Sequence, residues 1–171
     1  MKHPLRFSFF VMLAALMGLA GCNSSSGKKK KNFETAIARF FLESEDEREA
    51  FASVTLPVSG VKIAINNKPI VTEFDFTGVQ IAQADLGPFL VFNLTPEATR
   101  DVYRVTTSNQ GKRLVLFINN MPVGARMIEG PFSTGAIAVF VAIPDELLPK
   151  VVKNLDATSK DYQKQIEKEK K

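Results

Sequence analysis

The chain has 171 residues, a length that suits one folded domain. Its composition, 45% hydrophobic and 23% charged, is that of a globular protein and excludes a wholly disordered chain and a protein with many membrane spans. The single histidine is His3 and the single cysteine is Cys22, so the chain beyond residue 21 has no histidine. This excludes a Ser-His-Asp triad, a Cys-His pair, haem ligation by histidine and the common zinc sites. We expect no cofactor.

The N-terminus has the pattern of a cleaved export signal. Lys2 and Arg6 precede the 12 apolar residues 7–18, a run too short to cross a hydrocarbon core about 30 Å thick. Leu19-Ala20-Gly21-Cys22 follows, and it resembles the lipobox of bacterial lipoprotein precursors. The resemblance implies that residues 1–21 are removed and that Cys22 becomes the N-terminus, with a thioether-linked diacylglycerol and an amide-linked acyl chain. The alternative is an ordinary secretory signal with an incidental cysteine.

The lipobox resemblance also predicts where the protein lies. Two or more acyl chains hold a protein stably on a membrane, so the first expected partner is the lipid bilayer, through Cys22. The domain would then be lipid-anchored in the cell envelope and face the periplasm. Residue 23 is asparagine and not the aspartate that commonly retains lipoproteins in the inner membrane, which favours the outer membrane. Residues 22–32 would form a flexible tether, in which Lys28–Lys31 either meet lipid head groups or are a solvated spacer.

The basic character of the chain is confined to its two ends. The whole chain has a net charge of +4, whereas residues 32–149 carry nine basic and 14 acidic side chains. A nucleic-acid-binding domain has its basic residues on the folded surface instead. We therefore expect no nucleic-acid partner.

Residues 33–156 are predicted to form one α+β domain. Residues 37–43 fit either a strand or a helix, and the acidic run 44–49 fits a loop or a solvated helical face. A weak helical pattern occurs near 73–84. Strands are expected where β-branched or alternating apolar residues occur, at 51–58, 61–65 and 89–94.

Thr95-Pro96-Glu97 is the clearest local signal. Threonine suits the N-cap, proline suits the first helical position and glutamate meets the positive end of the helix dipole, so a helix should run to about Thr107. Gly111 then ends it. Residues 113–118 and 121–128 should form a hairpin around Asn119-Asn120.

The C-terminal third should contain one more strand and one more helix. Residues 136–143 are nearly all apolar and predict a central strand buried on both faces. Asp145 should cap the last helix, and residues 157–171 should be a charged tail of frayed helix or disorder. This order predicts a mostly antiparallel sheet with two helices on one face, of the split β-α-β (ferredoxin-like) type, preceded by extra N-terminal strands.

Several motifs resemble the periplasmic head domain of SecD, a subunit of the bacterial preprotein translocase. They are Leu94-Thr95-Pro96-Glu97-Ala98, Thr106-Thr107, Gly111-Lys112, the strand Leu114–Ile118 with Asn119, Asn120 and Val123, and the return through Ile128, Gly130 or Gly135, and Ile137. The resemblance covers about residues 61–156. It departs at Gly124-Ala125-Arg126, where the family has Ser-Ala-Pro, and in the absence of the family's membrane helices from the expected mature chain. It implies the SecD fold, the periplasmic side and a surface that meets unfolded polypeptide, envelope proteins or translocase proteins.

Two functions are consistent with this sequence. The first is a non-enzymatic lipoprotein with a SecD-head-like binding module, in which an uncovered sheet edge binds an extended segment. The alternative is an envelope hydrolase that uses a carboxylate pair or a Ser/Lys pair. Its candidate residues are Glu73 with Asp75, Asp145 with Glu146, and Ser133 with Lys112. The acidic run 45–49 lacks the spacing of a calcium loop, so we expect no metal site.

Overall fold

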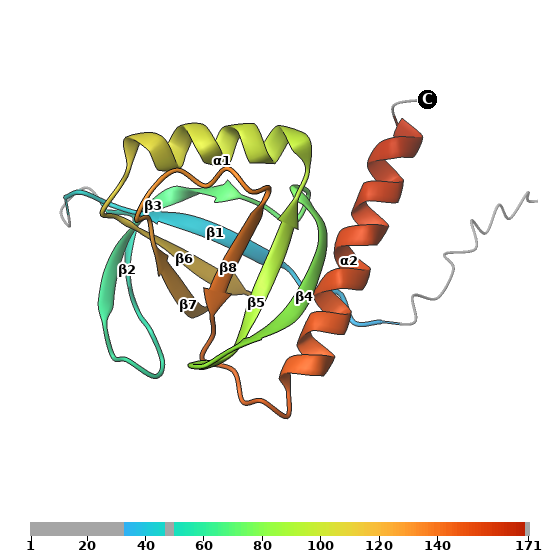
Figure 1. The fold of residues 1–171 in the computed structure, drawn as a ribbon, viewed down its shortest axis with the longest axis horizontal. Coiled ribbons are helices and arrows are strands. Elements are labelled where there is room, and N and C mark those ends of the chain that lie inside the picture. Colours follow the sequence, from blue (N-terminus) through green and yellow to red (C-terminus); the bar gives the residue numbers. More distant parts are fainter. Residues whose placement is uncertain (1–32, 47–49, 170–171) are drawn as a thin grey trace, which may run out of the picture. The chain divides into compact units, whose positions relative to one another are not determined.

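A computed structural model describes residues 33–46 and 50–169 as two antiparallel sheets and two helices (Figure 1). Leu19, Ala20, Gly21, Cys22 and the tether lie outside the described residues. The first sheet, called sheet A, has the order β2-β3-β1-β6-β7, with β1 Ala38–Glu43, β2 Ala52–Thr55, β3 Lys62–Val71, β6 Arg113–Ile118 and β7 Met121–Met127. The second, sheet B, has the order β4-β5-β8, with β4 Phe76–Ala84, β5 Gly87–Leu94 and β8 Ala136–Phe140. The helices are α1 Pro96–Ser108 and α2 Leu148–Glu169.

The main core lies between the two sheets. Phe40 of β1 packs edge-on against Phe92 of β5, with ring centroids 5.2 Å apart, and Phe76 of β4 lies 5.1 Å from Phe92. All three rings are fully buried. Both helices add to the same cluster, α1 through Ala98 and Val102 and α2 chiefly through Leu148 and Leu155. The two sheets and both helices therefore share one hydrophobic core.

The local signals of the sequence are confirmed where they concern α1 and the hairpin. The Thr95 hydroxyl accepts a hydrogen bond from the Ala98 amide at 3.2 Å, and the helix begins at Pro96. Asn119 and Asn120 have φ values of 49° and 66°, as a two-residue hairpin turn requires. Residues 113–118 form β6, with the expected bounds.

The α+β class is confirmed, but the single sheet with both helices on one face is not found. The strands on either side of α1, β5 and β6, lie in different sheets. α1 contacts both β3 and β5, whereas α2 lies against β4 at the edge of sheet B (Figure 1). The weak helix expected near 73–84 is the strand β4, because its residues pair with β5 along the whole length.

One expectation near the C-terminus differs from the structure. β8 ends sheet B instead of lying in its centre, and Ile137 and Val139 are buried while Phe140 is exposed. The helix α2 continues to Glu169, so residues 157–169 take the helical one of the two forms expected for this stretch. Thr158 and Ser159 are buried there because their hydroxyl groups have hydrogen-bond partners inside the protein. The face of α2 that packs against the domain is therefore polar at Thr158 and Ser159, so the apolar pattern that usually marks a buried helix face is missing from this part of the sequence.

Among residues 33–46 and 50–169, no helix is both long enough and apolar enough to pass through a bilayer.

Candidate functional site

The edges of the two sheets differ in how they are covered. β4 is covered by α2, whose Asp156 carboxylate accepts from the Val79 amide at 3.3 Å. β7 and β8 face each other, and the Ala142 amide donates to the Val123 carbonyl at 2.6 Å. Arg126 bridges the same pair of strands by donating to the Ala138 carbonyl at 2.9 Å. β2 is the other edge of sheet A and pairs with β3 on one side. Among the described residues, no hydrogen bond of the kind that covers β4, β7 and β8 is found on its other side.

An apolar trough lies beside the β2 edge, on the face of sheet A that turns away from sheet B. Three buried residues form its floor, Ile63, Ile65 and Val115. Partly buried side chains surround them: Phe41, Ala52, Val54, Leu56, Phe117 and Ala125. This second apolar cluster is separate from the main core, so a face of the sheet that water reaches carries a largely hydrophobic surface.

The trough contains a hollow of about 160 Å³ next to β2. Phe41 and Phe117 meet edge-on in it with ring centroids 4.9 Å apart. Phe51, directly before β2, also lines the hollow and is 70% exposed. An aromatic side chain that is exposed next to an apolar hollow can bury a large apolar area when an apolar partner binds there.

Two arginine–glutamate pairs flank the aromatic part of the trough along β1. Arg39 lines the hollow and donates to both carboxylate oxygens of Glu73, at 2.8 and 2.7 Å. Glu43, four residues along the same strand face, accepts from the Arg113 guanidinium and, at 2.8 Å, from the Arg113 amide. The hydrogen bonds from Arg39 hold the pKa of Glu73 below its usual range, and those from Arg113 do the same for Glu43. Both carboxylates therefore stay ionised near neutral pH, and their hydrogen bonds hold the side chains of Arg39 and Arg113 in place.

The structure gives the candidate hydrolytic carboxylates of the sequence different surroundings. Glu73 is bound by Arg39, whereas Asp75 accepts from the amide and hydroxyl of Thr72 in the turn before β4. The two carboxylates thus have separate partners. Asp145 and Glu146 are both exposed ahead of α2.

Ser133 and Lys112 are not brought together. Ser133 lines a hollow of about 540 Å³ along α1 together with Thr99, Arg100, Tyr103, Arg104, Thr107 and Ser108. Lys112 is absent from this lining and bonds to Glu45 at 2.6 Å and to Asn109 at 2.8 Å.

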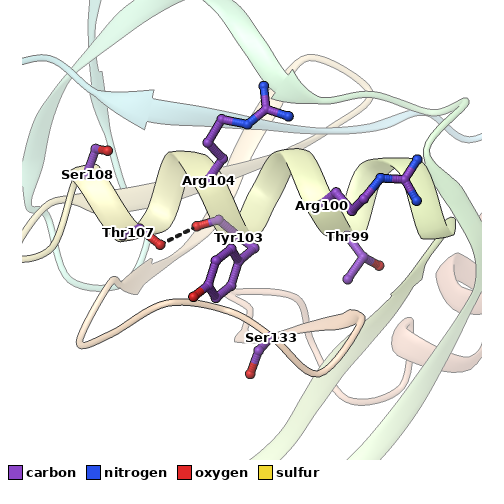
Figure 2. A pocket seen from close by; sticks show the side chains of 7 residues that line it. All are labelled: Thr99, Arg100, Tyr103, Arg104, Thr107, Ser108 and Ser133. Carbon is purple, nitrogen blue, oxygen red and sulfur yellow. Dashed lines mark hydrogen bonds between the residues drawn. The ribbon is translucent and has the colours of Figure 1, made fainter.

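The α1 hollow has no acidic residue in its lining, within the part of the chain that is described. Figure 2 shows Tyr103 turned toward Ser133, while the guanidinium groups of Arg100 and Arg104 point away from it. The Thr107 hydroxyl donates to the Tyr103 carbonyl at 2.7 Å, so this group is already used inside the helix (Figure 2). No group of three or more His, Cys, Asp or Glu side chains in residues 33–46 and 50–169 is placed to hold a metal ion. Residues 47–49 of the acidic run lie outside the described residues.

The trough is the feature that sequence reasoning missed. The sequence pattern that could have revealed it is Arg39, Phe41 and Glu43, at every second position. If residues 37–43 form a strand, these two charged side chains and the aromatic ring between them lie on one face. The sequence allows a helix there, and in a helix Phe41 lies on the side opposite to Arg39 and Glu43. Phenylalanine in a strand is usually buried in a core, so the residue type alone does not single out Phe117.

The comparisons with known proteins give a fold and no family. No protein-family model matches the chain, and no curated protein matches its sequence. A structure of SecDF, described as a membrane component that enhances protein export, is 16% identical with a TM-score of 0.54, over 74% of this chain and 63% of that one. SecDF in its super-membrane-facing form is 18% identical with a TM-score of 0.54, over 73% of this chain and 18% of that one. The chain therefore spans less than two thirds of these proteins, and the resemblance to SecD is confirmed as a shared fold.

Proposed function

We propose that this protein is a membrane-held envelope lipoprotein whose domain binds extended polypeptide, of an export substrate or of an envelope or translocase protein, and that it is not an enzyme. The observation that carries the proposal is the apolar trough beside the uncovered edge of β2. The SecD-like fold supports the link to export, since SecDF is described as enhancing protein export.

The chemistry of the trough suits an added strand. An extended segment that pairs with β2 gains main-chain hydrogen bonds, which are largely independent of its sequence. Its alternate side chains would point to the trough, where Phe51 and Val54 offer apolar contact. β2 itself has the sequence Ala-Ser-Val-Thr, without the lysine or proline that commonly blocks pairing at sheet edges.

The hydrolase alternative has less support. A hydrolytic site needs a nucleophile or a carboxylate in a hollow, with its base within hydrogen-bond reach. The α1 hollow has serine, threonine and tyrosine hydroxyls but no carboxylate or lysine among its described lining residues.

Binding of a permanently unfolded polypeptide tests the proposal. The probe is a reduced and alkylated protein chain with a fluorescent label, titrated with the detergent-solubilised full chain. We expect Phe51→Asp to weaken binding roughly tenfold or more, since truncated aromatic anchors at interfaces commonly cost more than about 1.4 kcal/mol. Val54→Asp should do the same, because Val54 is one of the partly buried side chains that surround the floor of the trough.

Leu86→Asp is the matched control. Leu86 is 86% exposed in the turn between β4 and β5 of sheet B and belongs neither to the trough nor to its hollow, so the same change of charge and polarity should leave binding unaltered. Equal affinity of the wild-type chain and Phe51→Asp, with both proteins folded, contradicts the proposal. Cleavage of the probe by the wild-type chain would instead favour the hydrolase.

Membrane attachment through Cys22 rests on the lipobox resemblance and is tested separately. We expect the mass of the N-terminal peptide, isolated from cell envelopes, to be that of a chain beginning at Cys22 with a diacylglycerol and a further acyl chain. Flotation of separated membranes distinguishes the expected outer membrane from the inner. An intact leader, or an unmodified thiol, overturns the anchor without bearing on the trough.

A further inference from the structure

The exposed face of α2 carries a stripe of lysines. Lys153, Lys160, Lys164 and Lys168 are spaced by seven, four and four residues, so their side chains follow one side of the helix. Lys150 precedes them by less than one turn, and all five are exposed. We call these five residues the lysine stripe.

The stripe lies opposite the face by which α2 joins the domain. Leu148, Val152, Leu155, Thr158 and Ser159 are the buried residues of the helix. At 100° per residue, the mean direction of this buried set is about 160° from that of Lys153, Lys160, Lys164 and Lys168. The stripe therefore faces outward along the whole length of α2.

Much of the positive charge of the stripe is not neutralised. Lys150 has a 3.4 Å contact with Glu34, and Lys160 has a 2.7 Å contact with Asp156. Among the described residues, Lys153, Lys164 and Lys168 have no ion pair. The helix α2 as a whole carries these five lysines and four acidic residues, Asp156, Asp161, Glu167 and Glu169, so its net charge is +1. Residues 32–149 have the opposite sign, because they carry nine basic and 14 acidic side chains. The lysine stripe is thus a row of basic side chains on the outer face of α2, next to an acidic remainder of the domain.

The described chain begins against this same helix. The Ala36 amide donates to the Thr158 hydroxyl at 3.1 Å, and Asn154 donates to Glu34 at 3.5 Å, so residues 34–36 run along α2. The blue start of the ribbon lies beside α2 in Figure 1. Cys22 is 11 residues before Phe33 in the sequence, and four of the intervening residues are Lys28–Lys31. Eleven residues span at most about 40 Å when fully extended, so a surface that holds Cys22 lies within that distance of Phe33.

We propose that the lysine stripe lies on the surface of an anionic bilayer and thereby sets the orientation of the domain. The inference rests on the membrane anchor of the proposed function and deepens it. Lysines close to an anionic surface are attracted to it, and the acidic remainder of the domain is repelled. The N-terminal attachment and the stripe act on the same side of the molecule, so sheet A and its trough, which lie across the core from sheet B and α2, are left open to the periplasm.

Lysine footprinting on vesicles tests this orientation. The purified lipidated chain is placed on vesicles of equal parts phosphatidylglycerol and phosphatidylcholine, or on phosphatidylcholine alone, and treated with a membrane-impermeant amine reagent. Modification of each lysine is read by mass spectrometry. We expect Lys153, Lys164 and Lys168 to react about fivefold more slowly on the anionic vesicles, and Lys62 of β3 to react equally on both. Salt at about 1 M should abolish the difference, because it shortens the Debye length to roughly 3 Å.

A matched pair of double variants gives the control. Lys153→Gln with Lys164→Gln should remove most of the protection at Lys168, whereas Lys62→Gln with Lys68→Gln, which removes the same charge from β3, should leave it. Equal reactivity of the stripe on both kinds of vesicle overturns the proposal, as does protection of Lys62 in place of the stripe. If Cys22 proves unmodified, the anchor of the proposed function fails, and the stripe is still tested by adding the same protein to preformed vesicles.

Discussion

At Gly124 the backbone of sheet A lies close against the backbone of sheet B. A Cβ atom at this position of β7 would overlap the carbonyl oxygen of Phe140, at the end of β8. The neighbouring bond from the Ala142 amide to the Val123 carbonyl holds the two strands together there. The requirement for glycine is thus one of space, and it is imposed by backbone from the other sheet.

We predict that Gly124→Ala destabilises the protein by about 1–3 kcal/mol, the usual cost of overpacking, because backbone must move to admit the methyl group. The free energy of unfolding in urea measures the effect. Gly130→Ala is the control, since a Cβ there meets no atom within 4 Å and the residue does not have positive φ. A Gly124→Ala protein as stable as Gly130→Ala would show that the strands can separate freely.

The arginine–glutamate pairs of sheet A make stability depend on pH. The pKa values of Glu43 and Glu73 are lowered from 4.5 by their arginine partners, so each folded carboxylate binds a proton less readily than the unfolded one. Their contribution is complete above about pH 4.5 and is lost as the pH falls through the lower folded pKa.

Glu73→Gln should remove part of this dependence. Glu73 is 7% exposed and receives two hydrogen bonds from Arg39, so we expect a loss of roughly 1–3 kcal/mol at pH 7 and a smaller loss at pH 3. Urea unfolding at the two pH values is the measurement. Glu129→Gln, at an exposed position shortly after β7, is the control. Equal losses at both pH values would contradict the assigned role of the Arg39–Glu73 pair.

At the scale of elements, α2 protects the edge of sheet B. Its Asp156 carboxylate accepts from the Val79 amide, and its Gln163 side chain donates to the carbonyls of Phe74 and Phe76 at 2.7 and 3.0 Å. Side chains of a helix thus take the place of a neighbouring strand. A sheet edge covered in this way is unavailable for pairing with other chains.

We therefore predict that a chain ending at Asp156 is less stable by about 2 kcal/mol or more and aggregates. It loses the Gln163 bonds, the buried Thr158 and Ser159, and the contact between Tyr162 and Phe74. Thermal unfolding and light scattering measure the two effects. A chain that ends at Glu169 is the control, and equal stability of both truncated chains would show that residues 157–169 are a dispensable tail.

At the scale of the whole molecule, one core joins all the layers. Phe40 of sheet A touches Phe76 and Phe92 of sheet B, and both helices bury residues in the same cluster. Neither sheet has a large core of its own, because the trough cluster has three buried residues. Separation of the sheets would expose most of the buried apolar surface at once.

We predict a single cooperative unfolding transition for residues 33–169. Tyr103 on α1 and Tyr162 on α2 are the tyrosines of a chain without tryptophan, and far-ultraviolet circular dichroism reports the backbone. Hydrogen exchange of α1, α2 and both sheets should give one common free energy for the slowest amides of each. Separate transitions for the two sheets would contradict a shared core.

The elements predicted well from the sequence are those whose cause is local. The Thr95 cap and Pro96 define the start of α1 within one turn of chain, and two adjacent asparagines with positive φ make the turn between β6 and β7. The residues from 76 to 84 were misread because their strand character comes from pairing with β5 and burial under α2, and neither is visible in a short window.

The sequence by itself determined that no histidine occurs beyond residue 21, the lipobox pattern at Cys22, the cap of α1 and the β6–β7 turn, because each depends on residue identity or on contacts within a few residues. The tertiary structure alone decided the division into two sheets, the apolar trough, the cover that α2 gives to β4 and the direction in which the lysine stripe faces. Those features depend on pairings between segments tens of residues apart. Alternation along one strand shows that two faces differ, but only the packing of the other sheet decides which face is covered and which is left open.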